Sequence, residues 1–507
     1  MPSLLKPRWW QMAASALLYS STVLAQSQPV PSVALPPLPP APAGEFAAPA
    51  MPAAMPAAPG LPGGMPGMGA AGAGLPGMGV PGMGVPGMGM PGMGVPGMGV
   101  PGMGMMPGLP SQATITNLLG GVPGIGPMFT NPASVTKLVP DLGPFQVSGW
   151  FDYGFITNTS GPGSGYNGPY NSIDTNTLML NQAYFIFDWN LPDDGCWGVG
   201  AQADVLLGRD FWLAQSFGFE VNQDGTNKWN GDDELGLAIP QLYFETGNDV
   251  FQWKLGHFYS PIGYENLPAP TNFFYTKSYS YQFAGPFTFW GGIGTWAVTD
   301  NLTFDVGLVN TWNTLDAPSD HLNALAKATY RGENRDWYTS FGIITGPEFS
   351  NTAQLPGISN VWANRTRYSM IYSQNFGANC QWEYVADHWL GFQDQGTATQ
   401  GTAWWYGLDQ YLFYKISQQY KWGARVEWFR DEQGTRVGLG RRPGNPNGPP
   451  FAGNFYSITT GMNYTPYPNF TVRPEVRYDW FDGTANPYDD GQKEHQFLFG
   501  IDMITRF

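Results

Sequence analysis

The C-terminal stretch Lys493-Glu-His-Gln-Phe-Leu-Phe-Gly-Ile-Asp-Met-Ile-Thr-Arg-Phe507 alternates between two kinds of side chain. Counting back from the terminus in steps of two gives an apolar row, interrupted once by Thr505: Phe507, Met503, Ile501, Phe499 and Phe497. The positions between them give a more polar row: Arg506, Asp502, Gly500 and Gln496. Because the side chains of a β-strand alternate between the two faces of a sheet, this pattern predicts a strand with one apolar and one polar face.

The aromatic end of this strand indicates where its apolar face lies. A terminal strand that ends in Phe resembles the signal by which bacterial outer-membrane barrels are recognised for assembly. We therefore expect the barrel-assembly machinery to be a partner through Phe507. On this hypothesis the apolar face contacts outer-membrane lipid, and the polar face meets water inside a barrel.

The composition of the chain fits such a barrel and excludes two other classes. Of the 507 residues, 12% are charged and 15% are aromatic. Beyond the N-terminus no apolar run approaches the ~20 residues that a membrane-spanning helix needs, which excludes a helical membrane protein. The formal net charge of −15 excludes a nucleic-acid partner, which would need a basic surface.

The alternation seen at the C-terminus recurs from Phe145 onward, with short turns and long polar loops between the segments. The predicted strands are 145–157, 178–189, 197–207, 237–246, 250–258, 288–298, 301–312, 321–330, 335–344, 364–375, 379–389, 402–416, 420–430, 454–465, 469–481 and 494–507. A soluble β-sandwich or propeller would also alternate, but would seldom place so many Trp and Tyr residues at strand ends. The sequence therefore predicts an all-β fold: a transmembrane antiparallel β-barrel of about 16 strands, with short turns in the periplasm and long loops outside.

The N-terminal part of the chain differs from the barrel in composition. Residues 1–25 have the charged start, apolar centre and small-residue end of a signal peptide. Residues 26–110 are a low-complexity Pro/Ala segment and then a Pro-Gly-Met-Gly repeat, predicted to be a disordered spacer in the periplasm. A thioether site for a soft metal such as Cu(I) is the alternative for its methionines. Residues 111–143 are a lead-in or a plug, and the barrel is expected over 144–507.

No catalytic, cofactor or metal site is expected from the sequence. A hydrolase would need a Ser beside a His, and no recognisable Ser motif accompanies any of the four histidines, His257, His321, His388 and His495. They are expected to be girdle or loop residues. The acidic pairs lack the spacing of metal ligands. Cys196 and Cys380 start distant predicted strands, too far apart for a disulfide.

One long connection, about 259–287, is dense in aromatic residues and proline. A loop of that size and composition folds against a surface rather than extending into water. Inside a barrel the available surface is the inner wall. We therefore expect this loop to fold into the barrel and narrow its channel.

The same region carries a family resemblance. The run Lys254-Leu-Gly-His-Phe-Tyr-Ser-Pro-Ile-Gly-Tyr-Glu265, together with Ala269-Pro-Thr-Asn-Phe-Phe-Tyr275 and Gly285-Pro-Phe-Thr288, resembles the OmpL-like family of β-barrel porins. Thr299-Asp-Asn-Leu-Thr303 and Val309-Asn-Thr-Trp-Asn313 add to the resemblance, which covers about Phe145 to Phe507. It implies a pore-forming outer-membrane protein. The Pro/Gly/Met extension is a departure from the family.

Alternation assigns a set of charged residues to the lumen. The candidate pore-lining and constriction residues are Tyr264, Glu265, Lys277, Arg365, Arg367, Arg425, Glu427, Arg473, Glu475, Arg477 and Asp479. One hypothesis is that the basic residues of the thirteenth and fifteenth strands face the loop across the pore. The alternative is local ion pairing of Arg473 and Arg477 with Glu427 or Glu475. The two are compatible.

The expected function is passive diffusion of small hydrophilic solutes through a water-filled barrel. Two alternatives remain at this stage: a surface adhesion or scaffold barrel whose lumen is blocked, and, less favoured, an outer-membrane lipid hydrolase. The sequence indicates neither the solute nor the ion preference. It leaves the oligomeric state open, with a homo-oligomer among the options.

Overall fold

The computed structural model describes residues 145–507, except 170–173, 193–194, 223–224, 231–234, 317–320, 351–360, 398–399, 438–450 and 484. The predicted signal peptide, spacer and lead-in, residues 1–143, lie outside the described residues. Among those described, no helix is long and apolar enough to cross a membrane.

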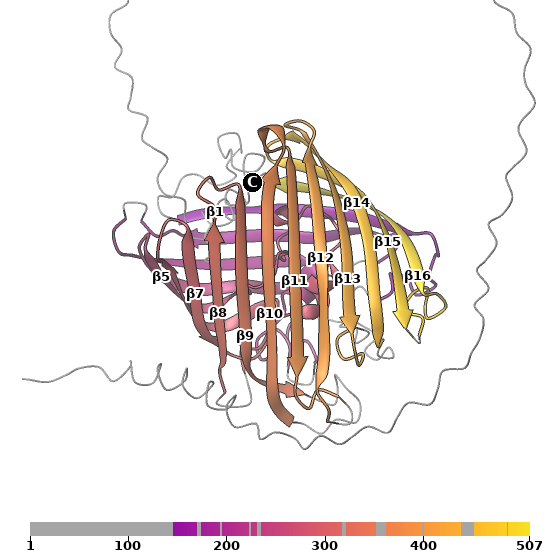
Figure 1. The fold of residues 1–507 in the computed structure, drawn as a ribbon, viewed down its shortest axis with the longest axis horizontal. Coiled ribbons are helices and arrows are strands. Elements are labelled where there is room, and N and C mark those ends of the chain that lie inside the picture. The colour runs from indigo at the N-terminus through magenta and orange to yellow at the C-terminus, as the bar shows by residue number, and fades with distance from the viewer. Residues whose placement is uncertain are drawn as a thin grey trace, which may run out of the picture. The chain divides into compact units, whose positions relative to one another are not determined.

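The described chain forms one closed antiparallel barrel, in which each strand pairs with its neighbours in sequence and β1 pairs with β16 (Figure 1). The prediction of an all-β barrel of about 16 strands is confirmed. The strands are β1 (Phe145–Asn158), β2 (Leu178–Trp189), β3 (Gly198–Gly208), β4 (Gly236–Gly247), β5 (Phe251–Tyr259), β6 (Thr288–Ala297), β7 (Leu302–Val309), β8 (Asn323–Arg331), β9 (Trp337–Ser350), β10 (Val361–Phe376), β11 (Trp382–Gln393), β12 (Ala403–Lys415), β13 (Tyr420–Asp431), β14 (Gly453–Tyr467), β15 (Phe470–Gly483) and β16 (His495–Arg506).

Some strand ends differ from the predicted ones. β9 continues six residues beyond the predicted end at 344, through Gly346 and Pro347 to Ser350. A Gly-Pro pair is a turn signal in sequence, but here the lengthened β10 supplies a partner for each of these positions. β7 ends at Val309 instead of 312, and beyond it the backbone N–H of Trp312 donates to the Glu348 carboxylate of β9.

The two faces of the strands follow the alternation read from the sequence. On β16, Phe499 is 42% exposed and Met503 is 43% exposed, whereas Leu498 and Asp502 are each 1% exposed. The same contrast holds on β15, where Tyr478 lies outside and Asp479 is buried. The apolar row therefore lies on the outer surface of the barrel, as a lipid-facing wall requires.

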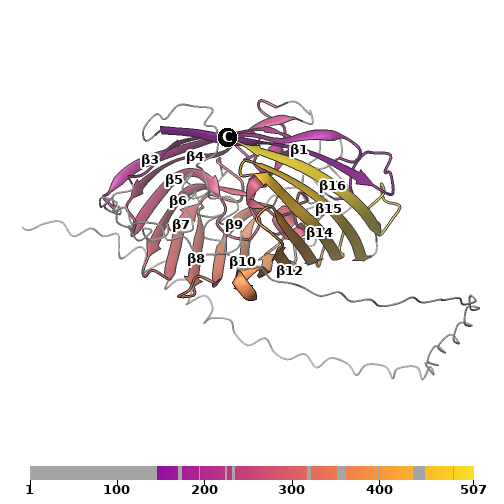
Figure 2. The same cartoon turned by 90° about the horizontal axis from the view of Figure 1, so that it is seen from above.

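The C-terminal residue helps to close the barrel. The backbone N–H of Phe507 donates to the Gly149 carbonyl, and the Gly149 N–H donates back to the Phe507 carbonyl, both at 3.0 Å. The Phe507 ring packs against Phe151 and Phe185, with ring centroids 5.5 and 5.7 Å apart. Figure 2 shows β1 and β16 side by side where the wall closes.

Candidate functional site

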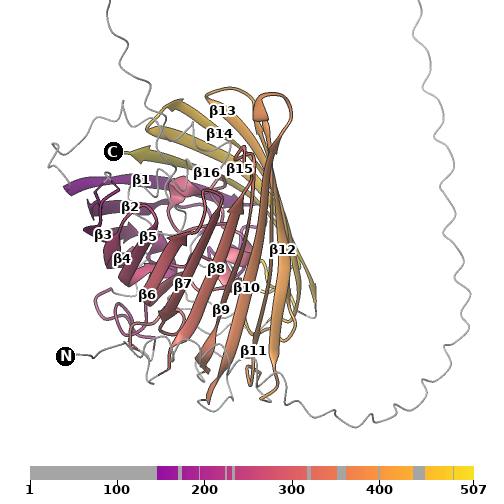
Figure 3. The same ribbon diagram turned by 60° about the vertical axis from the view of Figure 1, so that its left-hand side comes forward.

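The connection between β5 and β6 lies inside the wall, on the inner face of the barrel (Figures 2 and 3). It contains two single helical turns, η3 (Ala269–Thr271) and η4 (Ser280–Ala284). Most of its aromatic side chains are buried, and Phe273 packs on Phe413 of β12 with a centroid distance of 4.8 Å. The aromatic and proline content that marked this loop in the sequence is therefore the apolar surface that it buries against the wall.

Three carboxylates of the inner wall accept hydrogen bonds from the backbone of this loop. We call Glu475, Glu427 and Asp387 the carboxylate clamp. Glu475 of β15 accepts the backbone N–H groups of Tyr275 at 2.8 Å and Thr276 at 3.1 Å, and also the Thr276 hydroxyl at 2.5 Å. Glu427 of β13 accepts the N–H of Tyr279 at 2.7 Å, and Asp387 of β11 accepts that of Tyr264 at 3.0 Å. Buried bonds to an ionised acceptor are stronger than bonds between neutral groups, so the clamp fixes the loop to three strands.

Wall arginines bind the carbonyl groups of the same loop. Arg473 donates to the carbonyls of Ala269 at 2.9 Å and Asn272 at 2.6 Å. Arg425 donates to the Thr276 carbonyl at 2.8 Å and to the Glu265 carboxylate at 2.7 Å. The wall thus satisfies both kinds of backbone group in a buried, irregular segment, which would otherwise carry unpaired polar atoms.

These arginines also form ion pairs along the wall. Glu427 lies 2.8 Å from both Arg425 and Arg477, and Arg477 lies 2.8 Å from Asp479. Arg473 pairs with Asp502, which stands directly opposite it on β16. The two sequence hypotheses therefore combine, since the same side chains contact the loop and pair locally. The partner of Arg473 differs from the one expected, because Asp502 is its register neighbour.

The structure brings all the predicted site residues to the lumen or to the loop within it. Arg365 and Arg367 of β10, Arg425 and Glu427 of β13, and Arg473, Glu475, Arg477 and Asp479 of β15 are buried on the inner face. Tyr264, Glu265 and Lys277 belong to the loop. The Lys277 ammonium donates to the carbonyls of Asn266 at 2.9 Å and Leu267 at 3.2 Å. Burial lowers the pKa of Lys277 to about 8, against the opposing effect of Asp210.

Sequence reasoning missed two basic residues that are less buried than this group. Lys327 and Arg331 of β8 share the inner face with Leu325 and Thr329 and are only half-buried. Asp305 of β7 stands opposite Lys327, but no carboxylate of the described residues lies within 4.0 Å of either base. Arg331 instead lies over the Tyr338 ring at 5.9 Å. In β8, the inner-face residues alternate with outward-facing alanines and Tyr330. This alternation is the sequence pattern that could have placed Lys327 and Arg331 on the inner face.

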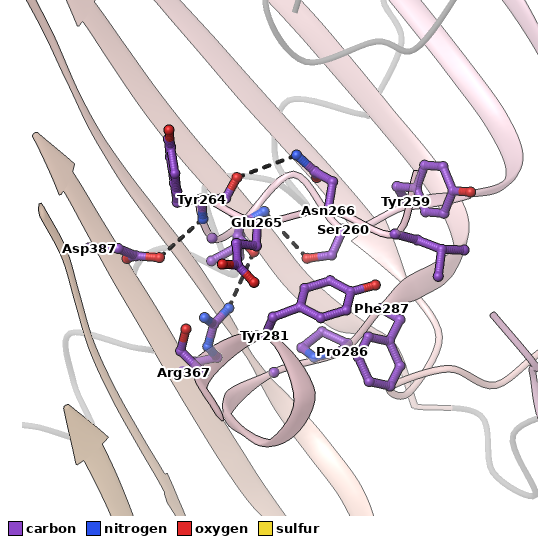
Figure 4. Close-up of a pocket in the computed structure, with 15 residues that line it drawn as sticks. Tyr259, Ser260, Tyr264, Glu265, Asn266, Tyr281, Pro286, Phe287, Arg367 and Asp387 are labelled. Carbon is purple, nitrogen blue, oxygen red and sulfur yellow. Dashed lines mark hydrogen bonds between the residues drawn. The ribbon is translucent and has the colours of Figure 1, made fainter. Parts of the chain in front are cut away.

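A cleft lies between the loop and β10–β11 (Figure 4). Tyr264, Tyr281 and Phe287 line it from the loop, and Arg367 and Asp387 reach it from the wall. It combines aromatic surface with a few polar groups, a composition typical of sites for small molecules.

The structure places a serine beside a histidine, a pair that no sequence motif predicts. Ser216, in the connection between β3 and β4, lies 3.0 Å from Nε2 of His257. The Ile239 carbonyl, 2.9 Å from Nδ1, can only accept, so Nδ1 carries the proton and Ser216 donates to Nε2. Both side chains are fully buried, and the imidazole is stacked on Trp290 with a centroid distance of 4.5 Å. The pair is therefore sealed from lipid and water, and it fastens the connection to the outer face of the barrel.

Glu220 completes this attachment, and we call Ser216, Glu220 and His257 the outer latch. The Glu220 carboxylate accepts the N–H groups of Ser216 at 2.8 Å and Ile239 at 3.0 Å. Burial raises the pKa of Glu220 from 4.5 to about 7. When the pKa of a group is higher in the folded protein than in the unfolded chain, the protonated group stabilises the folded state. This stabilisation is complete below the pKa of the unfolded chain, and it is lost as the pH rises through the pKa of the folded protein.

The latch should therefore weaken between about pH 4.5 and pH 7, by about 3 kcal/mol in total. Limited proteolysis of the β3–β4 connection, measured from pH 4.5 to 8 for wild type and Glu220→Gln, tests this. The ratio of the two cleavage rates removes the pH dependence of the protease itself. Wild-type cleavage should rise with pH relative to the variant, and a constant ratio would contradict the assignment.

Comparison with known proteins gives a family for the barrel. The family model described as "Putative beta-barrel porin-2, OmpL-like" matches residues 144–507. No curated protein matches the chain.

Several solved structures have similar folds. The outer-membrane channel DcaP of Acinetobacter baumannii is 13% identical with a TM-score of 0.47, over 72% of this chain and 97% of that one. OprB of Pseudomonas putida is 12% identical with a TM-score of 0.46, over 72% and 94%. An anion-selective porin from Comamonas acidovorans is 9% identical with a TM-score of 0.43, over 72% and 99%. On the family match, the chain belongs to the OmpL-like putative beta-barrel porin-2 family, and it is a porin-type barrel of the outer membrane.

Proposed function

We propose that this protein lets small hydrophilic solutes diffuse passively across the outer membrane. The solutes pass through the barrel lumen beside the infolded loop, residues 260–287, which narrows the passage. The observation that carries the proposal is that this loop is held inside the barrel by the carboxylate clamp and the wall arginines, and by Gln182 of β2. No covalent step is involved, and selectivity comes from the shape and the charges of the lining.

The distribution of charge supports a passage beside β8. The bases that bind the loop on β13 and β15 are buried and paired with carboxylates. Lys327 and Arg331 of β8 are half-buried. Water and ions therefore meet the lining of β8, rather than the bases of β13 and β15, which were one of the hypotheses drawn from the sequence.

Conductance of the purified protein in planar lipid bilayers tests the proposal. A water-filled lumen predicts discrete, ohmic current steps in KCl. A scaffold barrel with a blocked lumen predicts intact insertion without such steps. The outer latch does not support the hydrolase alternative, because its serine and histidine are fully buried.

The N-terminal segment provides a separate prediction. We propose that residues 26–143 lie in the periplasm and act as a spacer and lead-in to the barrel. Deleting them should leave the single-channel conductance in KCl unchanged. A plug would behave differently, since its removal would raise the conductance. The measurement compares current histograms of the full-length and deleted chains, after insertion has been matched by heat-modifiability on gels.

A further inference from the structure

Arg367 differs from the other arginines of the inner wall. Arg365 lies 3.2 Å from Glu348, and Arg425 lies 2.7 Å from Glu265. Arg473 and Arg477 are likewise paired with carboxylates. Arg367 is just as buried, at 3% exposure, but no carboxylate of the described residues lies within 4.0 Å of its guanidinium.

The hydrogen bonds of Arg367 are also incomplete. Its Nη1 donates one long bond, of 3.4 Å, to the Ile262 carbonyl. Its Nε–H has no acceptor. A buried guanidinium that lacks both an ion pair and a full set of acceptors is costly, because it loses hydration without replacement. The carboxylates of Asp387 and Asp409 offset the charge of Arg367 from beyond 4.0 Å. A direct acceptor for its Nε–H is still missing among the described residues.

The open side of the guanidinium faces the cleft of Figure 4. The two carboxylates at this cleft are already engaged. Asp387 accepts from the Tyr264 N–H and from the Ser369 hydroxyl, and Glu265 accepts from Arg425, the Tyr411 hydroxyl and the Ser278 N–H. The cleft thus offers the Arg367 guanidinium as an incompletely used donor, and no unused carboxylate.

The backbone around Arg367 leaves its side chain little freedom. A Cβ added to Gly285 would lie 2.7 to 2.9 Å from the Nη1, Cζ and Nε atoms of Arg367. The guanidinium therefore lies flat on the Gly285 backbone. This arrangement fixes the orientation of the guanidinium edge, which can form a bidentate hydrogen-bonded pair with a carboxylate.

From these observations we infer that Arg367 is the binding residue of a subsite for small carboxylates in the passage. The carboxylate accepts from the Arg367 guanidinium. The rings of Tyr264, Tyr281 and Phe287 contact the apolar body of the solute. This inference rests on the proposed function, and it names a solute class for it.

Benzoate is a suitable probe, and benzamide is its uncharged counterpart of the same shape. Calorimetric titration of the detergent-solubilised full chain measures binding without requiring conduction. Arg367→Gln should raise the benzoate Kd about tenfold or more, because it removes a charge-assisted interaction. Arg367→Lys should recover only part of the affinity, since an ammonium lacks the planar fork. Benzamide should bind weakly to every form.

Gly285→Ala gives a second variant that keeps Arg367 itself. It should weaken benzoate binding by displacing the guanidinium, while KCl conductance persists. Equal benzoate affinity in wild type, Arg367→Gln and Gly285→Ala would overturn the inference, as would benzamide binding as tightly as benzoate. Either outcome alongside normal KCl conductance leaves the porin proposal standing. Absence of KCl conductance would instead count against the porin proposal.

Discussion

Replacement of Glu475 by alanine should release the infolded loop and enlarge the passage. The Glu475 carboxylate accepts the Tyr275 N–H, the Thr276 N–H and the Thr276 hydroxyl, all in a buried setting. Removing one partner of such a buried network costs roughly 3–5 kcal/mol, because the donors are left without acceptors. Since 1.4 kcal/mol corresponds to a tenfold change in equilibrium, the docked state should become roughly a hundredfold less favoured or more. Single-channel recordings should show severalfold larger and noisier current steps.

Glu432→Ala is the matched control for this experiment. Glu432 follows β13 and pairs with Arg430 at 2.8 Å, but the two side chains remain 30% and 27% exposed. Exposed pairs contribute only about 0–1 kcal/mol, so this variant should conduct like wild type. Glu475→Ala steps identical to those of wild type and Glu432→Ala, in a folded barrel, would show that the clamp does not hold the constriction.

Neutralising Lys327 and Arg331 should shift the ion preference of the passage toward cations. Both side chains lie on the inner face of β8, half-buried and without an ion pair among the described residues. The interaction energy of two unit charges 4 Å apart in water is about 1 kcal/mol. Each basic side chain should therefore raise the local anion concentration roughly fivefold. The reversal potential of Lys327→Gln/Arg331→Gln in a KCl gradient should therefore move toward the cation value. The shift should shrink toward 1 M salt, where screening is stronger.

Arg335→Asn controls for loss of charge in the same hairpin. Arg335 is exposed in the turn after β8 and has a φ of 55°, a conformation that Asn tolerates. Its removal should leave the reversal potential near the wild-type value. If the reversal potential of the double variant is unshifted, or if the control shifts it equally, Lys327 and Arg331 do not set the ion preference of the passage.

The fold was predictable from sequence because a membrane barrel repeats one simple pattern. A lipid-facing row such as Phe497, Phe499 and Met503 must stay apolar, and a one-residue slip would expose Asp502 to lipid. Strand ends were less predictable. Gly346 and Pro347 are turn formers in isolation, and only the length of β10 decides that they continue β9.

The site was predictable as a set of residues and not as a set of contacts. Alternation placed Arg473 and Glu475 on the inner face, and the aromatic loop could be expected to meet that face. The register that pairs Arg473 with Asp502 joins residues 29 apart, and the Glu475–Thr276 bonds join residues 199 apart. No local pattern encodes such distances. Ser216 and His257 meet for the same reason, through a connection that folds back over the outer wall.

A closed barrel that is narrowed by a docked loop should still carry water and ions. Single-channel recordings of the full-length protein and of Glu475→Ala, side by side in planar bilayers, measure this. Wild type should give ohmic current steps, and the variant should give larger ones. If neither protein conducts although protease protection verifies insertion, the lumen is not an open passage.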